Sequence, residues 1–115
     1  MNKYIVGIDL GGMSAKGALF SFDGSIICED KVETNDENGF EKVVKSLAQL
    51  TKQLSQKARI GFDEIQAIGV GSPGVVDSTN GIVLRWTNFG WNNVPLADYL
   101  GGLTGKKVTV ANDAN

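Results

Sequence analysis

The chain has 115 residues, of which 42% are apolar and 21% charged, and this composition is typical of a single soluble globular domain. A net charge of −2 gives no basic surface for nucleic acid, and a lone cysteine, Cys28, excludes an internal disulfide. The absence of histidine excludes Ser-His-Asp catalysis within the chain, so any catalysis depends on carboxylates, Lys, Ser, Thr or a bound metal.

No apolar run approaches the roughly 20 residues that a membrane-spanning helix needs, and the N-terminus has no signal-peptide pattern. We therefore expect a cytoplasmic protein that has neither a membrane nor a nucleic acid as its partner.

The first third of the sequence predicts three antiparallel strands. Residues 4–10 form an apolar run interrupted by one glycine and one aspartate, which is typical of a central strand buried on both faces. Residues 16–22 alternate in polarity, an Asp-Gly pair then signals a hairpin, and residues 25–33 continue as a third strand.

A helix is expected next. Apolar residues recur at helical spacing from Phe40 to Ala58. Asn38 and Glu41 resemble a capping box at the start of this helix, and Gly61 is the expected end.

The remaining sequence predicts a strand at 65–72, a hairpin at 75–84, an aromatic loop at 86–91, a short helix at 96–100 and a last strand at 106–112. This order of elements favours an α/β fold with a mixed sheet, in which an antiparallel meander is extended by parallel strands through helical crossovers.

The segment GIDLGGMSAKG, residues 7–17, concentrates glycines at the first tight turn. It is not a Walker A loop, because Met13 and Ser14 follow Gly12. It is not a dinucleotide-binding fingerprint either, because a strand rather than a helix comes next. Glycines would let backbone N–H groups approach an anion, and Asp9 could bind a phosphate through a divalent cation. The alternative is a plain Gly-Gly hairpin in which Asp9 bonds to the turn.

Two further segments have open interpretations. GVGSPG, residues 69–74, predicts a tight turn at a strand end, either bordering a ligand with its backbone or serving only as a turn. In the aromatic loop, Trp86 and Trp91 are candidates for the core or for stacking on a sugar. Asn88 could bond to hydroxyl groups or have an ordinary loop role.

The sequence ends in ANDAN, which looks like a strand-to-helix junction. Ligands gather at such carboxyl ends of strands in α/β sheets. Asp113 suits a general base that accepts a proton from an alcohol, and its alternative role is a helix N-cap. We expect the 115 residues to be part of a longer protein.

Taken in order, GIDLGGMSAKG, GVGSPGVVD, NFGWNNVPL and VANDAN resemble the N-terminal domain of the ROK family of sugar kinases, across essentially the whole chain. The NFGW…PL form is most similar to bacterial glucokinases of that family. The resemblance implies a ribonuclease H-like mixed sheet of the actin and hexokinase superfamily. It also implies that residues 1–115 are the N-terminal sugar- and phosphate-binding lobe of a two-domain kinase whose C-terminal lobe is absent.

The implied reaction is transfer of the γ-phosphoryl group of ATP to a hexose hydroxyl with Mg²⁺, and Asp113 is implied as the catalytic base. Residues implied in sugar binding are Asn112, Asn88 and Gly74. Residues implied in binding the ATP phosphates are Asp9, Gly11, Gly12 and Lys16, with Asp9 also facing the metal, directly or through water.

The family resemblance also implies that the full-length protein is a homo-oligomer with a small-molecule hexose as partner. A structural zinc, where present, would belong to the absent lobe. Two positions depart from the family pattern, since Met13 stands where a Thr is usual and Ala111 where a Glu is usual. Because half of the cleft is missing, we expect residues 1–115 alone to have no hexokinase activity.

The alternatives to a kinase are a ROK-like sugar-sensing regulator and a catalytically weakened sugar-binding protein. Such regulators carry an N-terminal helix-turn-helix, and this chain starts three residues before its first expected strand, which favours the kinase. An actin- or chaperone-like ATPase would share the hairpin but would not explain NFGW or NDAN.

Overall fold

The computed structural model describes residues 4–34 and 39–113. Its strands are Tyr4–Leu10 (β1), Ser14–Ser21 (β2), Ile26–Glu33 (β3), Ile65–Ser72 (β4), Val75–Asp77 (β5), Ile82–Trp86 (β6), Trp91–Val94 (β7) and Lys107–Asn112 (β8). Its helices are Gly39–Ala58 (α1) and Leu96–Thr104 (α2), with 3-10 turns at Phe62–Glu64 (η2) and Thr87–Phe89 (η3).

The main sheet has five strands in the order β3-β2-β1-β4-β8, and β5-β6-β7 form a second, smaller sheet. β1, β2 and β3 are antiparallel to their neighbours, whereas β4 runs parallel to β1 and β8 parallel to β4. The predicted mixed sheet is therefore confirmed. Because β1, β4 and β8 run in one direction, their carboxyl ends meet at one edge of the sheet.

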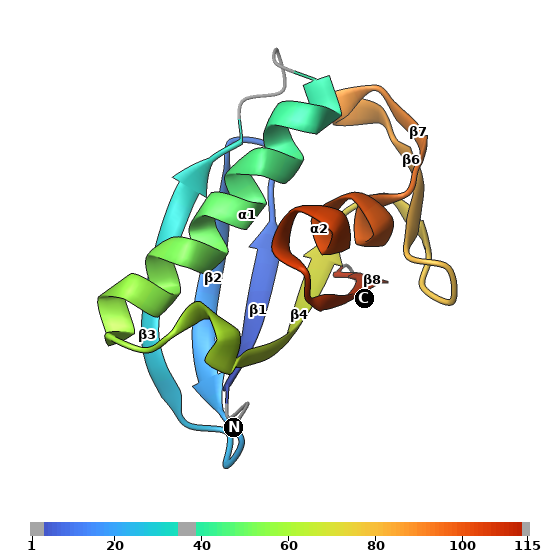
Figure 1. The fold of residues 1–115 in the computed structure, drawn as a ribbon. Coiled ribbons are helices and arrows are strands. Elements are labelled where there is room, and N and C mark those ends of the chain that lie inside the picture. The colour runs from blue at the N-terminus through green and yellow to red at the C-terminus, as the bar shows by residue number, and fades with distance from the viewer. Residues whose placement is uncertain (1–3, 35–38, 114–115) are drawn as a thin grey trace.

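Both helices lie on the same face of the main sheet (Figure 1), and α1 and α2 also pack against each other. Alternation along β1 turns Val6, Ile8 and Leu10 toward the helices, where they are buried. Ile5 and Asp9 point to the other face and are exposed. The prediction that β1 is buried on both faces is wrong, because neither described helix covers the second face.

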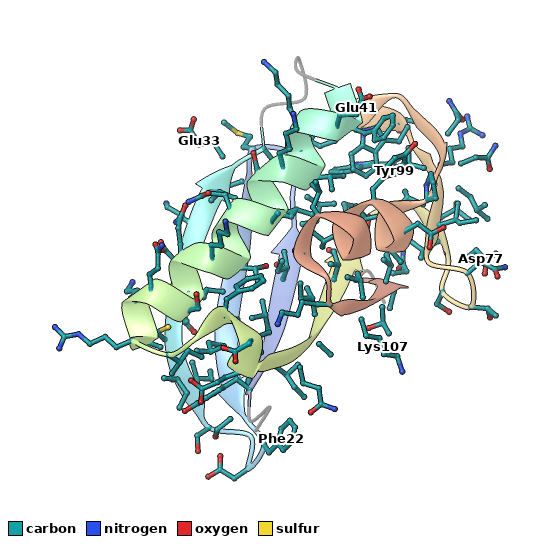
Figure 2. The ribbon with its side chains drawn as sticks, in the orientation of Figure 1. Phe22, Glu33, Glu41, Asp77, Tyr99 and Lys107 are labelled. Atoms are coloured by element: carbon teal, nitrogen blue, oxygen red, sulfur yellow. The ribbon has the colours of Figure 1, made fainter. Side chains whose placement is uncertain are left out.

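α1 packs on β2 and β3, and its buried apolar side chains belong to one core cluster with those of β1 and β4. Leu47, Leu50 and Leu54 are fully buried, and burying each side chain stabilises the fold by about 1.5–3 kcal/mol. α1 approaches β2 closely at Gly17, where a Cβ atom would lie only 2.9 Å from Cδ2 of Leu50. At the N-terminal end of α1, the Phe40 ring contacts the Tyr99 ring of α2, with centroids 5.1 Å apart. Tyr99 is labelled in Figure 2.

The C-terminal end of α1 differs from the prediction. The helix ends at Ala58 and not at Gly61, because Arg59 adopts a left-handed conformation with φ 59°. The Arg59 N–H donates to Gln56 O and the Ile60 N–H to Ser55 O, which is the hydrogen-bond pattern of a Schellman motif. A non-glycine residue thus closes the helix. The predicted cap Asn38 lies outside the described residues.

The expected aromatic loop contains a 3-10 turn and a strand, β7, that the sequence did not reveal. Trp86 of β6 and Trp91 of β7 face each other in register, and their rings are 5.3 Å apart. Phe89 stacks on Trp86 at 3.9 Å. Trp86 and Trp91 are only 5% and 4% exposed, so they are core residues and offer no open face to a sugar.

α2 is longer than expected and ends at Thr104, where Gly105 follows with φ 71°. Among the helices in the described residues, none combines the length and the apolar character that crossing a membrane requires.

Candidate functional site

The carboxyl edge of the main sheet brings Asp9 and Asp113 together. Asp9 is the next-to-last residue of β1 and pairs in register with Gly71 of β4. Asp113 follows β8, and its N–H donates to Ser72 O at 3.1 Å, which extends the β4–β8 ladder past Asn112. The two aspartates therefore approach each other across β4, although they lie near opposite ends of the sequence.

Gly71 makes the space in which the two carboxyl groups meet. A Cβ atom at Gly71 would lie 3.1 Å from the Cβ of Asp113 and 3.8 Å from Ile8 O, so even an alanine would press on Asp113. The predicted strand at 65–72 and strand-end turn at 69–74 do not include this role of Gly71. The available signal was the alternation of Gly69 and Gly71, since residues two apart in a strand share a face.

The pKa of Asp113 is raised above its ordinary value. Partial removal of water from the carboxyl group has the largest effect, followed by the hydrogen bond with Asp9 and then the negative charge of Asp9. A hydrogen bond between two carboxyl groups requires that one of them carries a proton. Asp113 is therefore a better proton acceptor than an isolated aspartate, as a general base requires.

The turn between β1 and β2 lies at the same edge of the sheet. β2 begins at Ser14, two residues earlier than expected, so the turn is tight. The Gly11 N–H donates to Ser14 O at 3.0 Å, and a Cβ atom at Gly11 would be 2.8 Å from that same oxygen. Neither Gly11 nor Gly12 has a positive φ. Close approach of the backbone, not a left-handed conformation, is thus what demands glycine at Gly11.

Lys16 lies beside Asp9 on the uncovered face of the sheet. The two residues are directly opposite each other in the β1–β2 ladder. Both line an open depression of about 510 Å³, whose floor includes Gly7, Gly69 and Gly71. Glu29 lines the same depression, so a ligand that enters there meets one cationic and two anionic side chains.

Asn112 and Gly74 are also brought together. The side-chain amide of Asn112 donates to Gly74 O. Gly74 has φ +87°, and a Cβ atom there would lie 2.2 Å from Arg85 O, so the approach of this turn to β6 requires glycine without any ligand. The backbone of Asn88 lies in η3, and its side chain is outside the described part of the structure. Two of the three expected sugar-binding residues are thus adjacent.

The residues at this edge fit the Mg²⁺ ion that the family resemblance implies. The described residues contain no cluster of three or more Asp, Glu, His or Cys side chains able to hold a metal by themselves. Mg²⁺ in phosphoryl-transfer sites usually needs only one or two carboxylates, because waters and substrate phosphates complete its shell. The exposed carboxylate of Asp9, next to a tight glycine turn, would be such a ligand.

The order β3-β2-β1-β4-β8, with a meander of three antiparallel strands and aspartates at the ends of β1 and β8, defines an α/β domain of the actin- and hexokinase-like class. The sequence model of the ROK family matches residues 5–115. The chain belongs to the ROK family.

Individual relatives agree with this assignment. The chain is 42% identical to a glucokinase of Thermotoga maritima over 112 residues, which are 96% of the chain and 34% of that enzyme. It is 32% identical to the xylose repressor of Caldicellulosiruptor bescii, over 96% of the chain and 28% of the repressor. The crystal structure of a ROK family glucokinase from Streptomyces griseus in complex with glucose and AMPPNP superposes with a TM-score of 0.84 at 28% identity, over 97% of the chain and 34% of that protein. The chain spans about a third of the length of these relatives.

Proposed function

We propose that this chain is the N-terminal sugar- and phosphate-binding lobe of a two-domain, ATP-dependent hexose kinase of the glucokinase type. The observation that carries the proposal is the meeting of Asp9 and Asp113 at the carboxyl edge of the sheet, with the pKa of Asp113 raised. Support comes from the glucokinase of T. maritima, which is 42% identical. A further support is that the S. griseus relative was crystallised with glucose and an ATP analogue.

Asp113 is the catalytic base of this mechanism. Its carboxylate accepts the proton of a sugar hydroxyl while the hydroxyl oxygen forms a bond to the γ-phosphorus of ATP. The bond from that phosphorus to the β–γ bridging oxygen breaks, and ADP leaves with the electron pair. The main demands on the protein are positioning and charge neutralisation, with one base at the nucleophile.

The phosphates are bound by the β1–β2 turn. The backbone N–H group of Gly12 approaches them, and Lys16 supplies a positive charge. Gly11 shapes the turn, because its own N–H is bonded to Ser14 O. Asp9 would hold Mg²⁺, directly or through water, and the ion supplies neutralisation of phosphate charge when bound. Without that cation Asp9 would repel the phosphates, so the proposal requires that Asp9 and the metal act together.

The sugar is bound on the other side of Asp113. The Asn112 amide, beside Gly74 O, supplies hydrogen bonds to hydroxyl groups at the turn after β4. Asn88 is expected to complete this set. The assignment to a hexose rests on the glucokinase relatives, and the second lobe contributes the remaining contacts.

A hybrid enzyme tests the proposal. The third of T. maritima glucokinase that matches this chain is replaced by residues 1–115, and the purified hybrid is assayed for hexose-dependent ADP formation with a panel of sugars. We expect turnover of glucose by the hybrid and none by residues 1–115 alone. Circular dichroism and thermal melting establish that the hybrid is folded.

Asp113→Asn in the hybrid removes the base and keeps the shape of the side chain. We expect kcat to fall by about 10²–10⁴-fold with little change in glucose affinity, in line with the usual contribution of a general base. The matched control is Asp63→Asn, an exposed aspartate in η2 at the opposite end of β4, which should leave kcat unchanged. Full activity of the Asp113 variant would remove Asp113 from its role.

A sugar-sensing regulator is the second candidate function, because the xylose repressor of C. bescii covers the chain nearly as well as the glucokinase does. The same hybrid distinguishes the two candidates. A folded hybrid that binds glucose by calorimetry but forms no ADP would favour the regulator, whereas sugar-independent ADP formation would contradict both.

A further inference from the structure

We propose that Thr34 is a positioning residue for the β1–β2 turn, and that its hydroxyl group holds the Gly11–Gly12 peptide in the orientation that accepts a phosphate. This inference rests on the function proposed above. Thr34 directly follows β3 and is only 2% exposed. The resemblance to sugar kinases did not single out this residue.

Thr34 holds the turn by two hydrogen bonds. Its Oγ1 donates to Gly11 O at 2.9 Å, and its backbone N–H donates to Met13 O at 3.1 Å. The end of β3 is brought beside the turn by the β2–β3 ladder, in which Glu33 pairs with Ser14. Figure 2 shows Glu33 at that end of β3. Two carbonyl groups of the turn are therefore bound from a neighbouring strand.

The consequence for the N–H groups follows from peptide geometry. In a trans peptide the C=O of one residue and the N–H of the next point in opposite directions, and the described residues contain no cis peptide. Because Gly11 O points to Thr34, the Gly12 N–H points away from Thr34. The same holds for Met13 O and the Ser14 N–H. Thr34 thus fixes the direction of two backbone donors at the tip of the hairpin.

This turn needs an external restraint because it contains two adjacent glycines. A peptide between two glycines rotates more freely than any other, since neither neighbour has a Cβ atom. Rotation of the Gly11–Gly12 peptide would exchange the N–H for the carbonyl oxygen, which repels an anion. Gly11 cannot be replaced to stiffen the turn, because a Cβ atom there would be 2.8 Å from Ser14 O. The hydrogen bond from Thr34, outside the hairpin, holds the peptide instead.

Kinetics of the hybrid enzyme test this role, because a merely structural role predicts lower stability with no selective effect on the nucleotide. Thr34→Val keeps the side-chain shape and the backbone N–H but removes the hydroxyl donor. We expect the KM for ATP to rise about tenfold, with the KM for glucose unchanged within twofold. Thr34→Ser, which keeps the hydroxyl, should restore the KM for ATP to the level of the unmodified hybrid.

Two results would overturn the inference. One is a folded Thr34→Val hybrid whose KM for ATP stays within twofold of the unmodified hybrid. The other is an equal rise in the KM values for ATP and glucose. If the valine variant does not fold, Thr34→Cys, which keeps a weak donor, is compared with Thr34→Ser. The cysteine variant should show the higher KM for ATP, and equal values contradict the proposal.

The outcome for Thr34 is separable from the outcome for the proposed function. If Asp113→Asn abolishes turnover and Thr34→Val leaves the KM for ATP unchanged, only the role of Thr34 fails. If the folded hybrid binds neither glucose nor ATP, the proposed function itself fails.

Discussion

Gly74→Ala probes the join between the end of β4 and the second sheet, where Asn112 and Gly74 meet. Gly74 has φ +87°, and an alanine Cβ would lie 2.2 Å from Arg85 O and 3.2 Å from both Arg85 C and Trp86 Cα. Ordinary contacts of a Cβ atom begin near 3.4 Å. The neighbours are backbone atoms of β6, so no side chain can swing aside, and the β4–β5 turn must move away from β6.

Gly24→Ala is the matched control. Gly24 has φ +91°, almost the same as Gly74, and its Cβ position has no neighbour within 4 Å. A left-handed conformation costs an L-residue about 1–2 kcal/mol, and this cost applies to both variants. The smaller backbone entropy of the unfolded alanine chain also applies to both and cancels in the comparison. The clash at Gly74 alone adds about 1–3 kcal/mol, the usual cost of inserting an atom into packed structure.

Urea unfolding of the 115-residue chain, followed by the fluorescence of Trp86 and Trp91, measures both variants. We expect the free energy of unfolding to fall by about 1–2 kcal/mol for Gly24→Ala and about 2–5 kcal/mol for Gly74→Ala, with equal m-values. If Gly74→Ala is no more destabilising than Gly24→Ala, the close approach of the turn to β6 is not a constraint, and the steric account of Gly74 is wrong.

The remaining predictions concern the carboxylate pair and the tip of the turn. Folding raises the pKa of Asp113, so the ionised carboxylate is less stable in the folded chain than in the unfolded chain. The free energy of unfolding should therefore fall as the pH rises from the ordinary Asp pKa through the raised pKa of Asp113. In the absence of divalent cations, Asp113→Asn should therefore increase the free energy of unfolding at pH 7, by less than about 1 kcal/mol because both aspartates are exposed. The gain should vanish at pH values below the ordinary Asp pKa. A lower free energy of unfolding at pH 7, measured by urea titration, would contradict the charge argument. Met13 is 86% exposed, so Met13→Thr should change the free energy of unfolding by less than about 0.5 kcal/mol. The added hydroxyl should lower the KM of the hybrid enzyme for ATP severalfold. An unchanged KM would show that a hydroxyl at this position of the β1–β2 turn makes no contact with the nucleotide.

Local signals predicted most of the fold. An apolar run, an Asp-Gly hairpin, a long amphipathic helix and two further strands gave the order of elements, and the order gave the mixed sheet. The failures occurred where a local signal competed with packing. Gly61 looked like the end of α1, yet Arg59 accepted the left-handed conformation because two N–H groups then satisfied the last carbonyls of the helix. β7 was missed because its pairing with β6 depends on the packing of Trp86 against Trp91.

In the candidate site too, the sequence predicted some features and missed others that depend on packing. Asp9 and Asp113 were identifiable because a charged residue at the end of an apolar strand is conspicuous, whereas Lys16 was identified only through the family motif. The position of Asp9 relative to Asp113 depends on which strand lies between them. β4 lies between β1 and β8, and its Gly71 leaves the space in which the two carboxyl groups meet. The alternation of Gly69 and Gly71 marks a face without side chains but does not say which residues will meet there, and nothing local marks a threonine that bonds to a carbonyl group of a distant turn. What the sequence could not provide was therefore the supporting contacts of the site, and these contacts determine the proton affinity of Asp113 and the direction of the donors in the turn.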